Sequence, residues 1–214
     1  MLVILDWDGT VCNSEARIVA CMRRASERAG LPVLHPEAIG NIIGLGLPEA
    51  IASLFPEAHS EQRQDLRDYY AEEWLAARGE PLALFDGVLP TLDTLLGQGH
   101  QLAVATGKSR RGLAREFEEH GIGNLFVASR CADETASKPH PLMLHELLQE
   151  TGCPVEQAVM VGDTEYDLKM AAAANMAGIG VSYGVHSRDR LHACGPLRVI
   201  DHFSELLDGP PVVA

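Results

Sequence analysis

Three short apolar runs, each ending abruptly at a polar residue, constrain the fold of this chain more than any other feature. The runs, with the polar residue that follows each, are 2–5 with Asp6, 102–105 with Thr106, and 158–161 with Gly162 and Asp163; a weaker run, 199–200, precedes Asp201. Each is apolar on both faces and flanked by helical patterns, which is typical of buried parallel strands. Because the carboxyl ends of parallel strands meet at one edge, where open α/β sheets bind ligands, we expect the polar residues to gather there. The pattern predicts a doubly wound, Rossmann-like α/β sheet.

The stretch between the first two strand runs contains helical patterns and no strand. Helices are predicted over 14–30, 36–43 and 48–55, and a fourth begins at Ser60. A single crossover rarely needs so much chain, so we expect a separate helical domain at 14–83, inserted into an α/β core made of 1–13 and 84–214. Helices packed on the periphery of the sheet are the alternative.

The α/β pattern resumes after residue 85. We expect helices over 91–96, from about Arg115 to His120, over 140–151 and over 167–175, strands at 125–127 and 178–181, and a frayed tail at 209–211.

Composition excludes several classes of function. The 214 residues are 46% hydrophobic and 22% charged, with a formal net charge of −13, so we expect no nucleic-acid or membrane partner for this acidic surface. The apolar start is too short for a signal peptide or a membrane span. Five scattered cysteines without a CxxC pair predict free thiols and a cytoplasmic protein.

Two carboxylates follow the first strand run directly. Asp6 and Asp8 are two residues apart, and Gly9 permits a tight turn after them. An ionised carboxylate can attack phosphorus as a nucleophile, and a second carboxyl beside it can carry the proton of the leaving group. In isolation such a pair can also serve as a helix cap.

The second strand run leads into a candidate phosphate site. Thr106 and Gly107 open a helix, where free N–H groups and a hydroxyl bind phosphate oxygens, although an ordinary helix cap has the same sequence pattern. Lys138 is one of only three lysines in the chain and follows a loop without apolar periodicity. It could neutralise a nucleophile and a phosphate, or lie on the surface.

A third group of polar residues follows the run at 158–161. Asp163 and Asp167 are four residues apart at the start of a predicted helix, on one side of its first turn. Clustered carboxylates without His or Cys suit a hard cation, and Mg²⁺ fits best, with Mn²⁺ as a substitute. The helix dipole alone could also favour the two acids.

Taken together, these residues resemble the haloacid dehalogenase-like superfamily, and most closely its phosphoglycolate phosphatase-like group. The resemblance rests on DWDGT at 6–10, Thr106, Lys138 and GDTEYD at 162–167, with the helical insertion in the place of that superfamily's cap. It implies that Asp6 is a nucleophile that forms an aspartyl-phosphate and that Asp8 is the acid–base group. It also implies Mg²⁺ held by Asp6, the carbonyl of Asp8 and Asp163, with support from Asp167, and phosphoryl oxygens bound by Thr106, Lys138 and the N–H of Gly107.

Departures from the superfamily's other branches narrow the activity. Asp8 stands where dehalogenases lack the acid, and the insertion contains no lysine of the kind that a phosphonate-cleaving relative uses. The resemblance also suggests that the loop at Gly44 lies over the active site, a simple helix–helix turn being the alternative. Arg17 is a weaker candidate for binding a substrate carboxylate.

The combined interpretation is a Mg²⁺-dependent phosphatase for a small phosphorylated metabolite, with phosphoglycolate as the best single guess from the resemblance. A sugar-phosphate mutase or a pyrophosphatase on the same machinery is an alternative. A phospho-accepting or binding module without turnover is the rival from another class. The oligomeric state and the substrate are not encoded in any pattern that we recognise.

Overall fold

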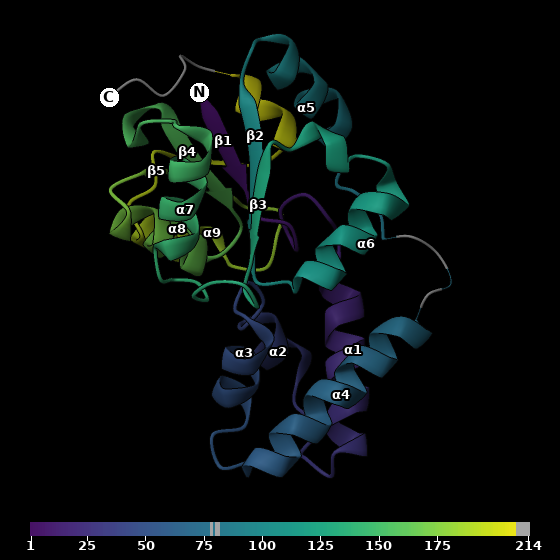
Figure 1. The fold of residues 1–214 in the computed structure, drawn as a ribbon. Helices are drawn as coiled ribbons and strands as arrows, with labels where there is room; N and C mark the ends of the chain where they lie inside the picture. Colours follow the sequence, from purple (N-terminus) through teal and green to yellow (C-terminus); the bar gives the residue numbers. More distant parts are fainter. Residues whose placement is uncertain (78, 80–81, 209–214) are drawn as a thin grey trace.

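A computed structural model, which describes residues 1–77, 79 and 82–208, contains a six-stranded parallel sheet (Figure 1). The strand order is β3-β2-β1-β4-β5-β6. The strands are β1 (Leu2–Leu5), β2 (Gln101–Thr106), β3 (Ala128–Cys131), β4 (Ala158–Gly162), β5 (Ala177–Val181) and β6 (Arg198–Ile200). This is the order of a doubly wound sheet, so the predicted fold class is confirmed.

Helices cover both faces of this sheet because every residue of its central strand is apolar. In β1, Val3 and Leu5 pack into one hydrophobic cluster, whereas Leu2 and Ile4 pack into another on the opposite face. The helices of the α/β part are α5 (Val88–Gly97), α6 (Arg110–His120), α7 (Leu142–Thr151), α8 (Glu165–Ala173) and α9 (Arg188–Ala193), with short 3-10 turns at Gly123–Leu125, Val155–Gln157 and Phe203–Leu207.

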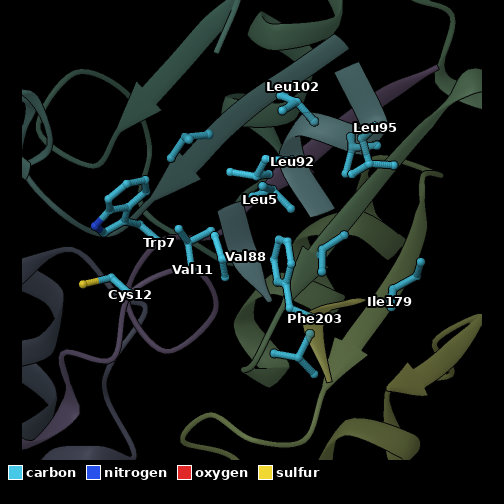
Figure 2. Packing of buried hydrophobic residues seen from close by; sticks show 14 of the residues in the cluster. Leu5, Trp7, Val11, Cys12, Val88, Leu92, Leu95, Leu102, Ile179 and Phe203 are labelled. Carbon is cyan, nitrogen blue, oxygen red and sulfur yellow. The ribbon is translucent and has the colours of Figure 1, made fainter. Parts of the chain in front are cut away.

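One of the two clusters is shown in Figure 2, where Trp7 lies at one end and Phe203 at the other. Leu92 of α5 packs against Leu5 and Leu102 in its middle. Trp7 continues the cluster past the end of β1 and contacts Phe117 of α6 edge to face, with ring centroids 5.2 Å apart. The residue between the two candidate catalytic aspartates is therefore fixed by the core.

The predicted helical insertion is also present, as α1 (Glu15–Arg28), α2 (Pro36–Gly40), α3 (Leu47–Leu54) and α4 (Ser60–Ala76). These helices lie together beyond the carboxyl ends of the strands (Figure 1) and enclose a hydrophobic cluster of their own around Met22, Ile51 and Leu66. We call them the cap. The division into two domains at residues 14 and 83 stays a prediction.

The predicted strand at 125–127 is wrong. The chain forms a 3-10 turn at Gly123–Leu125, and the strand begins only at Ala128. An apolar residue occurs at position 126 for a different reason: Phe126 stacks on Phe117 beside Trp7. The true strand is an edge strand with a single neighbour, so polar side chains are tolerated in it.

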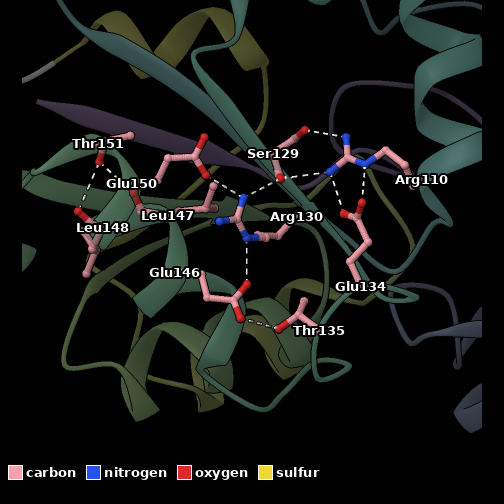
Figure 3. A network of polar contacts seen from close by, with 10 residues as sticks. All are labelled: Arg110, Ser129, Arg130, Glu134, Thr135, Glu146, Leu147, Leu148, Glu150 and Thr151. Carbon is pink, nitrogen blue, oxygen red and sulfur yellow. Dashed lines mark hydrogen bonds and ion pairs between the residues drawn. The ribbon is translucent and has the colours of Figure 1, made fainter.

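Two of those polar side chains, shown in Figure 3, tie the edge strand to its surroundings. Arg110, at the start of α6, donates to the Ser129 hydroxyl at 2.7 Å and pairs with Glu134 at 2.7 Å. Arg130 pairs with Glu146 and Glu150 of α7, each at 2.7 Å. The loop that carries Lys138 runs between β3 and α7, so these contacts hold together the two elements that flank it.

Other differences concern the ends of elements. Helix α2 stops at Gly40 instead of residue 43, α7 begins after Pro141, and α8 begins at Glu165, so that Asp167 lies in its first turn. Helix α9 was not predicted, and the tail at 209–211 lies outside the described residues. No helix in the described part of the chain is long and apolar enough to cross a membrane.

Candidate active site

The candidate site lies where the strand order reverses. The chain passes outward in one direction from β1 through β2 to β3 and in the other from β4 to β6, so the crevice opens between β1 and β4. Asp6 follows β1, and Asp163 follows β4. Ligands of open α/β sheets bind at this switch point, which gives the two carboxylates a functional position.

Three carboxylates converge there. Asp6, Asp163 and Asp167 each place an oxygen within 4.8 Å of the others, and all three side chains are buried. The backbone allows this because Gly9 adopts a φ of +86°, and a Cβ atom there would lie 2.2 Å from Oδ2 of Asp163. A side chain at position 9 would therefore displace Asp163.

Lys138 holds two of these carboxylates together. Its Nζ lies 2.6 Å from Oδ1 of Asp6 and 2.6 Å from Oδ1 of Asp167, with the lysine side chain fully buried. Burial favours the neutral amine, but Asp167 and Asp6 outweigh it and raise the pKa of Lys138. The lysine is therefore a charged group inside the site and not a surface residue.

One ammonium does not balance three buried carboxylates. Burial, together with the neighbouring carboxylates, raises the pKa of Asp6 well above its ordinary value, although Lys138 opposes the shift. Burial and Asp167 raise the pKa of Asp163 to about 7. Oδ2 of Asp6 has no hydrogen-bond partner among the described residues. This excess of oxygen ligands and negative charge fits a hard divalent cation such as Mg²⁺.

The Asp8 carboxylate lies apart from that cluster. Its Oδ1 accepts a hydrogen bond from Ser14 Oγ at 2.6 Å and pairs with Lys108 Nζ at 3.1 Å. Asp8 also lines a cavity that lies between the cap and the strand ends. Asp8 is thus placed for proton transfer, and its side chain is not one of the three clustered ligands.

Lys108 is a site residue that the sequence analysis missed. It pairs with Glu116 of α6 at 3.0 Å, and Glu116 in turn accepts a hydrogen bond from the indole of Trp7. Burial opposes the charged amine, but Asp8 and Glu116 raise the pKa of Lys108. Two sequence signals could have indicated this pair. Lysine is scarce in the chain, and an acid at position 116 falls on the apolar side of its helix.

The candidate phosphate-binding residues lie at the end of β2. Thr106 is buried, and its Oγ1 accepts a hydrogen bond from the N–H of Lys108 at 3.1 Å. Gly107 packs against the cap loop so closely that a Cβ atom would lie 2.6 Å from the carbonyl oxygen of Gly44. The loop at Gly44 therefore does lie over the strand ends.

A cavity of about 220 Å³ separates the cap from these strand ends. Asp6, Asp8, Thr106, Gly107 and Gly44 all line it. The structure therefore brings these predicted residues to one space, and Lys138, Asp163 and Asp167 lie buried behind Asp6 without lining it.

Arg17 is not among the described residues that line the cavity. Its guanidinium lies over the ring of Trp74, 5.7 Å from the centroid. A role in substrate binding stays a prediction for it.

The cap loop is fastened to the core by a set of contacts that we call the Asn41 clasp. The carbonyl of Asn41 accepts a hydrogen bond from Tyr166 Oη at 2.9 Å and lies 3.3 Å from Nε2 of His186, and its Oδ1 accepts from Arg190 at 2.6 Å. Near the site, the N–H of Gly46 donates to Ser137 Oγ at 2.8 Å. These bonds hold the cap loop against the core.

Comparison with known proteins agrees with this geometry. A family model described as haloacid dehalogenase-like hydrolase matches residues 3–181, which include all the candidate core residues. The chain belongs to the haloacid dehalogenase-like hydrolases. Within this family it is similar to phosphoglycolate phosphatases, as the sequence resemblance indicated.

Among the relatives of this hydrolase is a protein of Dickeya dadantii (strain 3937) named "Probable phosphatase IndB". It is 36% identical over 211 residues, which cover 96% of this chain and 91% of that protein. The phosphoglycolate phosphatase of Haemophilus influenzae (strain 86-028NP) is 31% identical over 215 residues, 96% of each chain. The crystal structure of a haloacid dehalogenase-like hydrolase from Bacteroides fragilis superposes with a TM-score of 0.89 at 26% identity, covering 96% of this chain and 99% of that one.

Proposed function

We propose that this hydrolase is a Mg²⁺-dependent phosphatase that releases phosphate from a small phosphorylated metabolite through an aspartyl-phosphate on Asp6. The phosphatase class is supported by the family and by the full-length similarity to proteins named as phosphatases. The observation that carries the proposal is that Asp6 belongs to two sites at once. It is one of three clustered carboxylates, and it lines the cavity together with Asp8 and Thr106.

The chemistry follows from these positions. An oxygen of Asp6 attacks phosphorus, the bond from phosphorus to the ester oxygen breaks, and Asp8 gives that oxygen a proton. Asp8, now ionised, then takes a proton from a water molecule that attacks phosphorus, and the bond to Asp6 breaks. Thr106, the N–H of Gly107 and Lys138 neutralise and orient the phosphoryl oxygens throughout.

Asp6, Asp163 and Asp167, with the backbone carbonyl of Asp8, are the groups that would hold Mg²⁺. The ion supplies charge neutralisation between the nucleophile and the phosphoryl group when bound. Lys138 favours the ionised form of Asp6, because its ammonium opposes part of the rise in pKa that burial causes. All five cysteines are unpaired, which supports a cytoplasmic location as part of the same proposal.

Phosphoglycolate is the first compound to test, because several relatives are named phosphoglycolate phosphatase. The test measures free phosphate from a panel of phosphate monoesters with Mg²⁺ and with chelator, for the native protein and for Asp6→Asn. We expect metal-dependent release that falls by at least about a thousandfold in Asp6→Asn, since the nucleophile is lost. Asp93→Asn, at an exposed position on α5, is the matched control.

A mass spectrum of the protein quenched during turnover separates the alternatives. A phosphoryl adduct on the peptide that contains Asp6, together with phosphate release, supports the proposal. An adduct that persists without release would indicate a phospho-accepting module. Release only as an isomerised sugar phosphate, with a bisphosphate activator, would indicate a mutase. Thermal melting of Asp6→Asn verifies that the variant is folded.

A further inference from the structure

The cap contributes no charged side chain to the described lining of the cavity. Every side chain that it does contribute is apolar or aromatic, apart from one glycine. They include Ile18 and Met22 of α1, Ile43 and Leu45 of the cap loop, and Trp74 and Leu75 of α4. The leaving group of any ester whose phosphorus lies at Asp6 must point into this space, because Asp6 and Asp8 line its opposite wall. The described part of this wall thus offers no positive side chain to balance an anionic leaving group.

The cavity is also larger than a two-carbon group requires. A single water molecule needs about 10–15 Å³ of such volume, and the cavity offers about 220 Å³. A phosphoryl group fills part of it at the core side, and glycolate would leave most of the rest empty. Unfilled apolar space next to a ligand loses contacts that a larger ligand makes.

The positive charges at the cavity lie on the core side. Lys108 is already paired with Asp8 and Glu116. Arg111 and Arg115 line the cavity from one side of α6 and have no ion-pair partner in the described part of the chain. Among the described lining residues they are the unpaired cations that could bind a carboxylate on the substrate, so a preference for phosphoglycolate would depend on them.

We propose that the substrate is the phosphate monoester of an uncharged, mainly apolar alcohol that is larger than two carbons, with its carbon body packed between α1, α4 and the loop at Gly44. This inference rests on the proposed function, and it names the leaving group that the phosphatase selects. The cap acts as a selective apolar wall, and the core supplies the charge in the described lining.

A homologous series isolates this preference. Ethyl, butyl and hexyl phosphate have leaving alcohols of nearly equal acidity, so differences in kcat/KM report contacts of the chain and not reactivity. Burial of each methylene is worth about fourfold, and we expect a rise of at least about tenfold from ethyl to hexyl phosphate. Phosphoglycolate and 2-hydroxyethyl phosphate, which match each other in size but not in charge, should both fall below butyl phosphate.

Leu75→Ala tests the wall itself. Leu75 lines the cavity on α4 and is 38% exposed, so its truncation does not open a hole in the cap core. The ratio of kcat/KM for hexyl over ethyl phosphate should fall by at least about threefold. Leu89→Ala, at a leucine that is 45% exposed on α5 and outside the cavity, should leave that ratio unchanged.

The outcomes separate this inference from the proposed function. If no ester of the panel releases phosphate in the presence of Mg²⁺, the proposed function is wrong. If phosphate is released but kcat/KM is flat along the alkyl series, or is highest for phosphoglycolate and drops in Arg111→Gln or Arg115→Gln, then the phosphatase stands and the apolar-substrate inference is overturned.

Discussion

Asp8 depends on a chain of three buried side chains that run through the core to Trp7. Lys108 bridges Asp8 and Glu116, and Glu116 accepts the indole N–H of Trp7. Each link is well paired, as buried charges must be. Trp7, which is not among the residues that line the cavity, therefore helps to fix the position of Asp8 through Glu116 and Lys108.

Glu116→Gln tests this positioning role. The substitution keeps the shape of the side chain and removes one of two negative charges that raise the pKa of Lys108. We expect kcat to fall by about tenfold with a smaller change in KM, because the loss concerns proton transfer. Glu118→Gln, on the exposed side of the same helix, should have no effect. An equal loss of kcat in both variants would contradict the role.

The raised pKa of Asp163 predicts how metal binding depends on pH. Its pKa of about 7, against an ordinary value near 3.8, means that the folded protein without metal keeps a proton there. The stabilisation from this protonated form is present at low pH and is lost as the pH rises through about 7. A bound cation replaces it, so Mg²⁺ should stabilise the protein more at pH 8 than at pH 5.5.

Thermal melting with and without Mg²⁺ at the two pH values measures this difference. At a concentration one hundred times the dissociation constant, binding adds about 2.7 kcal/mol, or about 5–10 °C in Tm for a chain of this size. Asp163→Asn should lose the gain at pH 8. A gain of equal size at both pH values would show that Asp163 does not titrate as described.

Whether a single site residue can be predicted from the sequence depends on its local sequence context. Asp6, Thr106 and Asp163 were found because each ends an apolar run at a strand end, a pattern that needs no tertiary information. Lys108 and Glu116 were missed because their pairing joins the start and the middle of a helix to another strand's end, which no spacing encodes.

Among the elements, the buried strands were predictable and the edge strand was not. β1 and β4 are covered on both faces, so their composition shows their environment. β3 contains Ser129 and Arg130, which bond to neighbouring segments and hide the strand pattern. The apolar residues just before it belong to the Trp7 cluster, and they misled the assignment for that reason.

The Asn41 clasp is the contact between elements that should control how often the cap loop opens. Tyr166→Phe removes one hydrogen bond to the Asn41 carbonyl, worth about 1 kcal/mol, or about fivefold in an opening equilibrium. Hydrogen exchange of the amides at 41–47 should therefore quicken about fivefold. Tyr69→Phe, within the cap, should leave their exchange unchanged.

On the scale of the whole molecule, the cap and the sheet have separate hydrophobic clusters. Leu66 and Leu92 are both fully buried, one in each cluster. Truncation of either to alanine should cost about 2–5 kcal/mol. If the cap is a domain as predicted, Leu66→Ala should lower the stability of the cap alone, and Leu92→Ala that of the α/β part.

Hydrogen exchange resolved by peptide distinguishes the two effects. In Leu66→Ala, faster exchange should be confined to α1–α4, with the strands as protected as in the native protein. Uniform acceleration across both parts would indicate one cooperative unit and overturn the division at residues 14 and 83.

The two chain segments that join the cap to the sheet are hydrogen-bonded to each other. Asn13 donates to the Ala83 carbonyl at 2.9 Å, and Phe85 donates to the Val11 carbonyl at 3.0 Å, which makes a short antiparallel ladder beside Asp8. Ser14, the first residue beyond it, donates to Asp8. Any twist of this ladder must therefore pull on one support of Asp8 while Lys108, the other, stays with the core. Movement of the cap and the position of the acid–base group are therefore coupled through the same short ladder.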